Sequence, residues 1–410
     1  MPPDPPTPVS PSSPAPDGSS AFGPFLLGVA SWFGAWGIQM VAFQWLVVAV
    51  LEEPPARVGA AQMSMTLPSL LFLLMGGAAA DRLDPRRMLM LVHTAAGLAV
   101  AALCGALVGG WLSYPLLLVY GFAFGTLQAF GLPARDTQLN DVAGGSMSRA
   151  VAGSLITQHG SQVLGAFAAG AAGWLGGAPI LGLQALLMLL GVVPISRLPG
   201  RRPAPVARAP LTLREVGGGM LEVVRSPVLR PVLFLAVATG LFFVGPFLVV
   251  LPLMVRDVYG GGAGEMGVLS AMFPLGAVSG GLLVYWAGGI RRNGPALILG
   301  QCAASASIGV IAVGIPFAGA VAAVYAWGLA GAFFINAGRT IFQTHASEAH
   351  RARVLSVYML GVMGGGPIGS LLSGLLAEPL GLHTTLALDA GLALAIALAV
   401  ATFTRLPRIH

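Results

Sequence analysis

The sequence predicts an all-α membrane protein with twelve transmembrane helices, arranged as two pseudo-symmetric halves of six helices each. Three observations lead to this prediction: the composition, a series of long apolar runs and the positions of the arginines. Of the 410 residues, 56% are hydrophobic and only 9% are charged, whereas a soluble domain carries about 25% charged residues. So few charges cannot cover a water-exposed surface, and we expect the surplus apolar side chains to face lipid.

The apolar runs give the number of expected helices, because a transmembrane helix needs about 20 mostly apolar residues. Residues 1–21 are rich in Pro and Ser, and we expect them to form a disordered cytoplasmic tail ahead of an uncleaved first helix. Residues 405–410 are expected to form a second cytoplasmic tail. The twelve helices are expected at residues 22–50, 58–80, 86–109, 112–134, 147–173, 176–196, 228–255, 265–288, 294–314, 316–342, 353–376 and 382–404.

The basic side chains favour an even number of helices with both termini in the cytoplasm. All 21 of the Lys and Arg residues are Arg, and all except Arg57 and Arg256 fall on one side if the N-terminus is inside. Cytoplasmic loops carry such an excess of basic residues, and an odd helix count would break the alternation. The arginines form short clusters between apolar runs rather than a stripe on a soluble face, so we expect no nucleic-acid partner.

The chain is expected to be a duplicated six-helix unit. Residues 197–227 are rich in Arg and Pro and are expected to form a cytoplasmic linker between an N-terminal half, 22–196, and a C-terminal half, 228–404. Several residues recur at an offset of 204 positions, which indicates a parallel repeat. The matching pairs are Gly77 and Gly281, Arg87 and Arg291, Arg135 and Arg339, Arg149 and Arg353, Gly165 and Gly369, and Gly170 and Gly374.

The strongest motif lies between the second and third runs and consists of Gly77, Asp81, Arg82, Arg86 and Arg87. Gly77 is expected to let another helix approach closely. Asp81 is expected to cap a helix N-terminus or to accept bidentate bonds from Arg. An ordinary positive-inside loop is the alternative. Because the second half has Tyr and Trp at the positions equivalent to Asp81 and Arg82, the charged latch is expected mainly in the first half.

Further motifs occur in the first, fourth and eleventh apolar runs. They are Gly34-Ala-Trp36 in the first run, Pro133-Ala-Arg135 at the end of the fourth, and Arg353 followed by Gly366, Pro367 and Gly369 in the eleventh. With the loop motif, they resemble the major facilitator superfamily over about residues 22–406, in the branch of the enterobactin exporter and macrolide-efflux proteins, which are drug:proton antiporters. The chain departs from that branch at Ala35, where many members carry an acid, and at Ala166, where a Pro is usual.

The resemblance implies the major facilitator fold and alternating access. It further implies proton-coupled export of a hydrophobic or amphipathic small molecule across the bacterial cytoplasmic membrane. We expect a monomer that contacts membrane lipid and needs no cofactor. Two alternatives stay open: a transporter of lysophospholipid or another lipid, and a non-transporting membrane receptor or assembly factor.

Polar residues inside the runs are the candidate site. Asp389 lies in the twelfth run, about 10 Å from its outer end at 1.5 Å per residue, where a charge costs several kcal/mol unless it is paired, hydrated or protonated. It is the first candidate proton carrier, followed by His93 and Asp136, although each has a structural alternative. The candidate cavity residues, each of which could instead join two helices, are Trp36, Gln39, Gln44, Gln128, His159, Gln162 and Asn336.

Other chemistries are not supported. Two G-x-G-x-x-G matches begin at Gly262 and Gly364, but neither follows a strand in a βαβ unit, so we exclude a dinucleotide site. No Walker A loop, G-x-S-x-G or H-E-x-x-H motif occurs in the sequence, so we expect neither an ATP-driven pump nor an enzyme, and no metal. Cys104 and Cys302 lie inside apolar runs and are expected to be packing residues without a disulfide.

Overall fold

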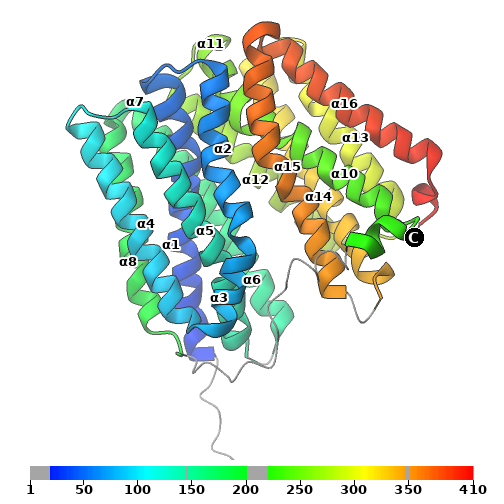
Figure 1. The fold of residues 1–410 in the computed structure, drawn as a ribbon, viewed down its shortest axis with the longest axis horizontal. Coiled ribbons are helices and arrows are strands. Elements are labelled where there is room, and N and C mark those ends of the chain that lie inside the picture. Colours follow the sequence, from blue (N-terminus) through cyan, green and yellow to red (C-terminus); the bar gives the residue numbers. More distant parts are fainter. Residues whose placement is uncertain (1–18, 145, 201–219, 348–350, 410) are drawn as a thin grey trace, which may run out of the picture.

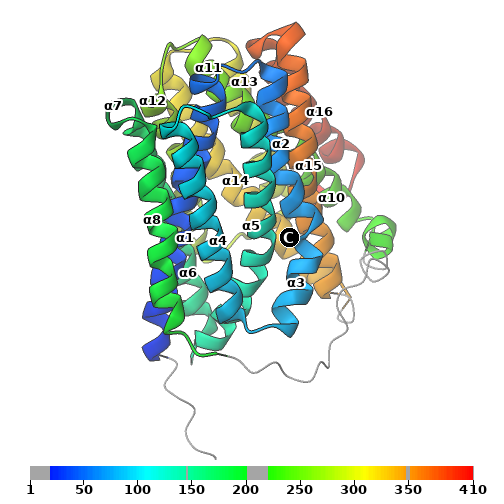
Figure 2. The same ribbon diagram turned by 60° about the vertical axis from the view of Figure 1, so that its left-hand side comes forward.

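The computed structural model describes residues 19–144, 146–200, 220–347 and 351–409. The predicted N-terminal tail up to residue 18 and residues 201–219 of the predicted linker lie outside the described residues. The described part of the chain is helical and contains no β-strand. Its helices stand side by side as two bundles, α1 to α8 and α10 to α16 (Figures 1 and 2).

The first half begins with a span that ends in a π-helical segment, followed by a span that is bent. The helix α1 (Ser19–Trp45) continues directly into a π-helix, η1 (Leu46–Val50). The helices α2 (Pro55–Leu71) and α3 (Leu73–Arg82) meet at a bend of 43°. Pro68 lies one turn before this bend and has no N–H for the helix, which accounts for the break. The remaining helices are α4 (Pro85–Val108), α5 (Tyr114–Val142), α6 (Met147–Gly170), α7 (Ala172–Leu175) and α8 (Gly177–Ser196).

The second half repeats this plan. Its first span, Leu229–Asp257, consists of α10 (Leu229–Phe242), a π-helix η2 (Pro246–Val250) and α11 (Leu251–Asp257). A π-helical segment therefore interrupts the first span of both halves. The other elements are α12 (Ala263–Trp286), α13 (Asn293–Ala312), α14 (Phe317–His345), α15 (Arg351–Leu380), α16 (Leu382–Phe403) and the short η3 (Leu406–Arg408).

All twelve predicted segments are helical, which confirms the predicted fold class. In the described chain, ten helices are long and apolar enough to span a membrane, and the α2–α3 pair makes eleven. The remaining long helix, α6, has 24 residues but is less apolar, because Thr, Gln, His and Ser occupy residues 157–162. The helix α6 packs against α1 and α12, and its polar stretch lies against α1, where Gly34 and Gly37 approach Ser161 and Gln162.

The two ends of the molecule differ in how the halves meet. We call the end with the α3–α4 connection the Arg-rich end; it is the lower end in Figure 1, and α7 and α11 lie at the opposite end. At the opposite end, Gly170 of α6 packs against Gly267 of α12, and Gly374 of α15 packs against Gly59 of α2. A Cβ on Gly267 would lie 2.9 Å from the Cα of Gly170, and one on Gly374 would lie 3.0 Å from that of Gly59. Gly170 and Gly374 are a repeat pair, so both halves use the same small residue to approach the other.

Candidate functional site

The interface between the halves is closed by a charged contact at the opposite end. Arg256, at the end of α11, donates a hydrogen bond from Nη1 to the backbone oxygen of Val48 at 2.8 Å and a longer one to that of Glu53 at 3.4 Å. Its Nη2 also donates to Asp257 Oδ2 at 2.9 Å. Val48 lies in the π-helix η1 of the first half. A single guanidinium of the second half therefore holds two backbone carbonyls of the first.

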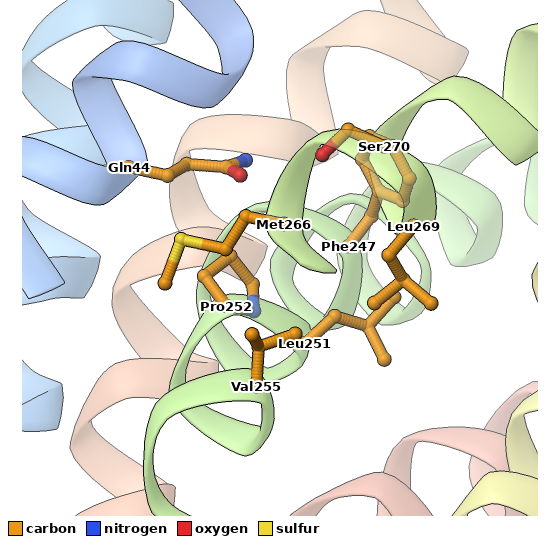
Figure 3. Close-up of a pocket in the computed structure, with 8 residues that line it drawn as sticks. All are labelled: Gln44, Phe247, Leu251, Pro252, Val255, Met266, Leu269 and Ser270. Carbon is orange, nitrogen blue, oxygen red and sulfur yellow. The ribbon is translucent and has the colours of Figure 1, made fainter. Parts of the chain in front are cut away.

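A small pocket lies next to this contact, between α1 and the second half. Its volume is about 10 Å³, enough for one water molecule. Figure 3 shows the amide of Gln44 pointing across the pocket toward the Ser270 hydroxyl. The amide oxygen and nitrogen of Gln44 are buried and have no hydrogen-bond partner in the described part of the chain. Gln44 is thus placed in the seam between the halves and not in an open cavity. The pocket is lined by Gln44, Phe247, Leu251, Pro252, Val255, Met266, Leu269 and Ser270.

Gln39 lies at the centre of a buried polar network in the first half. Its Oε1 accepts hydrogen bonds from the Tyr120 hydroxyl and from Gln184 Nε2, the latter at 2.6 Å. Its Nε2 donates to the sulfur of Met65 at 3.6 Å. These contacts join α1, α5, α8 and α2, and Gln39 is only 1% exposed. Sequence reasoning missed Tyr120 and Gln184, because a single polar residue in an apolar run does not reveal its partner.

An aromatic cluster follows the same face of α1. The ring centroids of Trp32 and Trp36 lie 6.1 and 6.0 Å from that of Phe124 on α5, with nearly parallel planes. Trp32 also lies 5.1 Å from the ring of His93 on α4. His93 is buried, and its Nδ1 lies 2.9 Å from the backbone oxygen of Leu89. This candidate proton carrier therefore sits inside the first half, bonded to its own helix.

Arg135 lies inside the helix α5, which corrects the predicted end of the fourth segment at residue 134. The helix continues to Val142, so Arg135 is about 10 Å from its end at 1.5 Å per residue. Its side chain packs against α1, with the guanidinium carbon 4.5 Å from the ring centroid of Phe33 and 5.6 Å from that of Trp32. Arg135 is 8% exposed, whereas the positive-inside pattern predicts a loop residue.

The two acids proposed as proton carriers occupy different surroundings. Asp389 is 5% exposed on α16 and accepts one long hydrogen bond, 3.4 Å, from the Ser373 hydroxyl of α15. Asp136 on α5 is exposed and lies close enough to Arg339 of α14 for an electrostatic interaction. Asp136 and Arg339 belong to opposite halves. Asp389 is therefore buried within the second half, whereas Asp136 of the first half interacts with a residue of the second.

The loop motif is arranged differently from the expectation. Asp84, and not Asp81, caps α4: its Oδ1 accepts a hydrogen bond from the backbone N–H of Arg86 at 3.1 Å. Asp81 is exposed in the last turn of α3, and within the described ranges it forms no hydrogen bond or ion pair. Arg82 and Arg87 are also exposed. The Nε atom of Arg87 lies 3.7 Å from Asp84 Oδ2.

The close approach predicted for Gly77 occurs one residue earlier. A Cβ on Gly76 would overlap the backbone oxygen of Ala129 on α5, whereas a Cβ on Gly77 would meet nothing within 4 Å. In the second half, a Cβ on Gly369 would overlap the Leu241 carbonyl of α10, so Gly369 packs the eleventh span against the seventh. Gly366 packs in the same way, with Val244 as its neighbour.

The other candidate residues are spread over several helices. Asn336 of α14 is exposed, and its amide donates to Ala332 of the same helix at 2.8 Å. Gln162 of α6 donates to the sulfur of Met40 at 3.1 Å. Partly exposed positions are held by Pro133, Gln128, His159, Trp36 and Arg353, while Pro367 is buried inside α15. In the described residues, no group of three or more His, Cys, Asp or Glu side chains could hold a metal ion.

Comparisons with known proteins agree with this architecture. The chain matches the model of the transmembrane secretion effector family over residues 15–410. A comparison with curated proteins finds no match. The fold is similar to that of a mutant of the nucleoside transporter NupG, with 15% identity and a TM-score of 0.78 over 93% of this chain and 99% of that chain.

Two other solved structures have the same fold. One is a POT family transporter in complex with 5-aminolevulinic acid, with 15% identity and a TM-score of 0.72 over 94% of this chain and 96% of that chain. The other is a bacterial homologue of the human lysosomal transporter Spinster in an inward-facing, unoccupied conformation, with 16% identity and a TM-score of 0.67 over 96% and 97%. The family match along almost the whole chain shows that this multi-pass membrane protein belongs to the transmembrane secretion effector family of major facilitator transporters.

Proposed function

We propose that the chain exports a hydrophobic or amphipathic small molecule by alternating access, driven by proton entry, as in the branch of the enterobactin exporter and macrolide-efflux proteins. The observation that carries this proposal is the unequal contact between the halves. At the end opposite the Arg-rich end, glycine pairs and Arg256 join them. Around Asp136 and Arg339, α5 and α14 make extensive contacts only with helices of their own half.

The direction of opening follows from the sidedness of the arginines. If the Arg-rich end faces the cytoplasm, as the positive-inside pattern favours, this structure is inward-facing. Export then needs a second state, in which the seam around Arg256 opens and the Arg-rich ends close. Paired glycines suit such a change, because flat helix faces can slide past each other.

Asp389 is the proposed proton carrier. The family acid of the first span is replaced by Ala35, so the carrier must lie elsewhere. Asp389 is buried with one weak partner, and a buried carboxylate with so little compensation favours proton uptake. Its helix also contacts η2, the irregular segment of the seventh span, so rocking of the halves would change its surroundings.

The test is transport by the purified protein in proteoliposomes with an imposed pH gradient, after a substrate screen. Asp389→Asn is expected to abolish accumulation against a gradient while sparing downhill exchange. Glu378→Gln is the matched control, because Glu378 is an exposed acid on the neighbouring helix α15. If Asp389→Asn still concentrates substrate, Asp389 is structural, and the carrier is His93 or Asp136, or transport is not coupled to protons.

A lipid transporter is the second candidate, and one observation favours it. An apolar groove of about 380 Å³ lies between α10 and α16, and its apolar lining suits an acyl chain. Phe234 and Phe403 at the groove are strongly exposed, at 60% and 88%. Competition of a lysophospholipid with the substrate found in the screen would support this candidate over a drug-like substrate.

A further inference from the structure

Arg135 is a buried cation that forms no hydrogen bond or ion pair within the described part of the chain. It is more than nine-tenths buried, yet in the described part of the chain its guanidinium donates no hydrogen bond and has no carboxylate oxygen within 4 Å. Its neighbours are the rings of Phe33 and Trp32. Aromatic faces attract a cation, but they cannot accept the five N–H bonds that a guanidinium offers.

The charges around Arg135 do not replace the missing partner. Asp136 follows it in the chain and acts on it electrostatically, but Asp136 is exposed, and in the described part of the chain its carboxylate forms no ion pair with Arg135 within 4 Å. His93, which also contacts the Trp32 ring, brings no negative charge. Burying a charge costs more free energy than stacking on aromatic rings contributes, unless a counter-charge lies nearby. An anion bound at Arg135 would supply that counter-charge.

The side chains around Arg135 are aromatic, and one ring of the group is partly exposed. Phe33, Trp32 and Phe124 are buried, whereas Trp36 is partly exposed and continues the stack by one further ring. The planar fork of a guanidinium fits the two oxygens of a carboxylate or phosphate. An anionic head on Arg135 would place the remainder of a ligand along these rings.

We propose that Arg135 binds an anionic group of the transported molecule and that the Trp32–Trp36–Phe124 stack receives its apolar body, so that the substrate is an amphipathic anion. This inference rests on the proposed function of a small-molecule transporter and narrows its substrate class. Arg339, the repeat partner of Arg135, is exposed and lies on no aromatic ring among the described residues, so the anion site belongs to the first half only.

The test compares three ligands of one shape: 2-naphthoate, 2-naphthalenemethanol and 2-naphthylmethylammonium. Their binding to the full chain in phosphatidylcholine nanodiscs is measured by calorimetry. Naphthoate is expected to bind the wild-type protein at least tenfold more tightly than the alcohol, and the ammonium is expected to bind most weakly. Arg135→Gln is expected to reduce the preference to less than twofold without lowering the unfolding temperature, whereas Arg339→Gln should keep the preference.

Two results would overturn the anion site: naphthoate that binds wild type no better than the alcohol, or a preference that persists in Arg135→Gln. Repeating the titration with phosphatidylglycerol in the nanodiscs identifies the source of the anion, since competition would assign the site to a lipid headgroup and its absence to a soluble anion. Transport is not needed for this measurement. A protein that binds naphthoate through Arg135 but fails to transport would contradict the proposed export and leave the anion site standing.

Discussion

Arg135 and Arg339 stand at equivalent positions of the two halves, 204 residues apart, yet one is buried on aromatic rings and the other is exposed. The helices around them are arranged alike, including the π-helical segments η1 and η2. The two halves therefore share a backbone plan, while the side chains in their interiors differ. The first half contains the buried network around Gln39 and the buried Arg135. We expect substitutions at these residues to affect stability and binding more than substitutions at the corresponding polar residues of the second half.

The polar networks of the two halves should show the largest difference. Gln39→Leu would leave the Tyr120 hydroxyl and the Gln184 amide buried without an acceptor, which is expected to cost about 2–4 kcal/mol of unfolding free energy. In the second half, Gln301 accepts a hydrogen bond from Thr239 at 3.0 Å and from no other described residue, and the Thr239 hydroxyl also donates to the backbone oxygen of Leu235. Gln301→Leu is therefore expected to cost about 1 kcal/mol or less. Unfolding of both variants in detergent measures the difference, and equal losses would contradict the proposed asymmetry.

The seam between the halves gives the next largest effect. Arg256→Ala removes both bonds from the second half to the first, and we expect it to favour the opened seam by about 1–2 kcal/mol. Arg57→Ala is the matched control, because Arg57 pairs with Glu53 at 3.0 Å within its own half. Spin labels at Val108 and Val313, exposed residues of opposite halves at this end, would report the separation. A shift of equal size in both variants would show that Arg256 does not hold the seam.

The sequence predicts the helices well because length and apolar content are properties of each segment alone. It predicts Arg135 poorly, because an Arg that ends an apolar run looks the same whether the helix stops there or continues. The residues after it, Asp136, Gln138 and Asn140, are polar and suggest a loop. They are helical because α5 extends past the apolar run. The packing of α5 against neighbouring helices determines this extension, and a single sequence does not show that packing.

The cap of α4 is a case in which a local signal existed. Asp84 precedes Pro85, and an Asp followed by Pro is a typical helix start, because the missing N–H of Pro is not needed in the first turn. The G-x-x-x-D-R spacing drew the prediction to Asp81 instead. Partners across helices, such as Tyr120 and Gln184 for Gln39, leave no comparable signal in a single sequence.

Asp81 should show the smallest effect on stability and a clear effect on function. In this structure Asp81 is exposed and its charge is not needed for the fold, so Asp81→Asn should change the unfolding free energy by less than about 0.5 kcal/mol.

We hypothesise that Asp81 holds the Arg-rich ends of the halves together in the outward-open state, since it belongs to the charged loop motif that the second half lacks. Asp81→Asn should then slow transport while the protein reaches the membrane at a normal level. Tyr285→Phe, at the equivalent position of the second half, should leave the rate unchanged. Rates in proteoliposomes, with the amount of inserted protein measured in each sample, decide the question. Full activity of Asp81→Asn would mean that the motif serves only to keep this loop on the cytoplasmic side. The loops after the second span of each half would then have similar roles, although only the first contains an acid at this position.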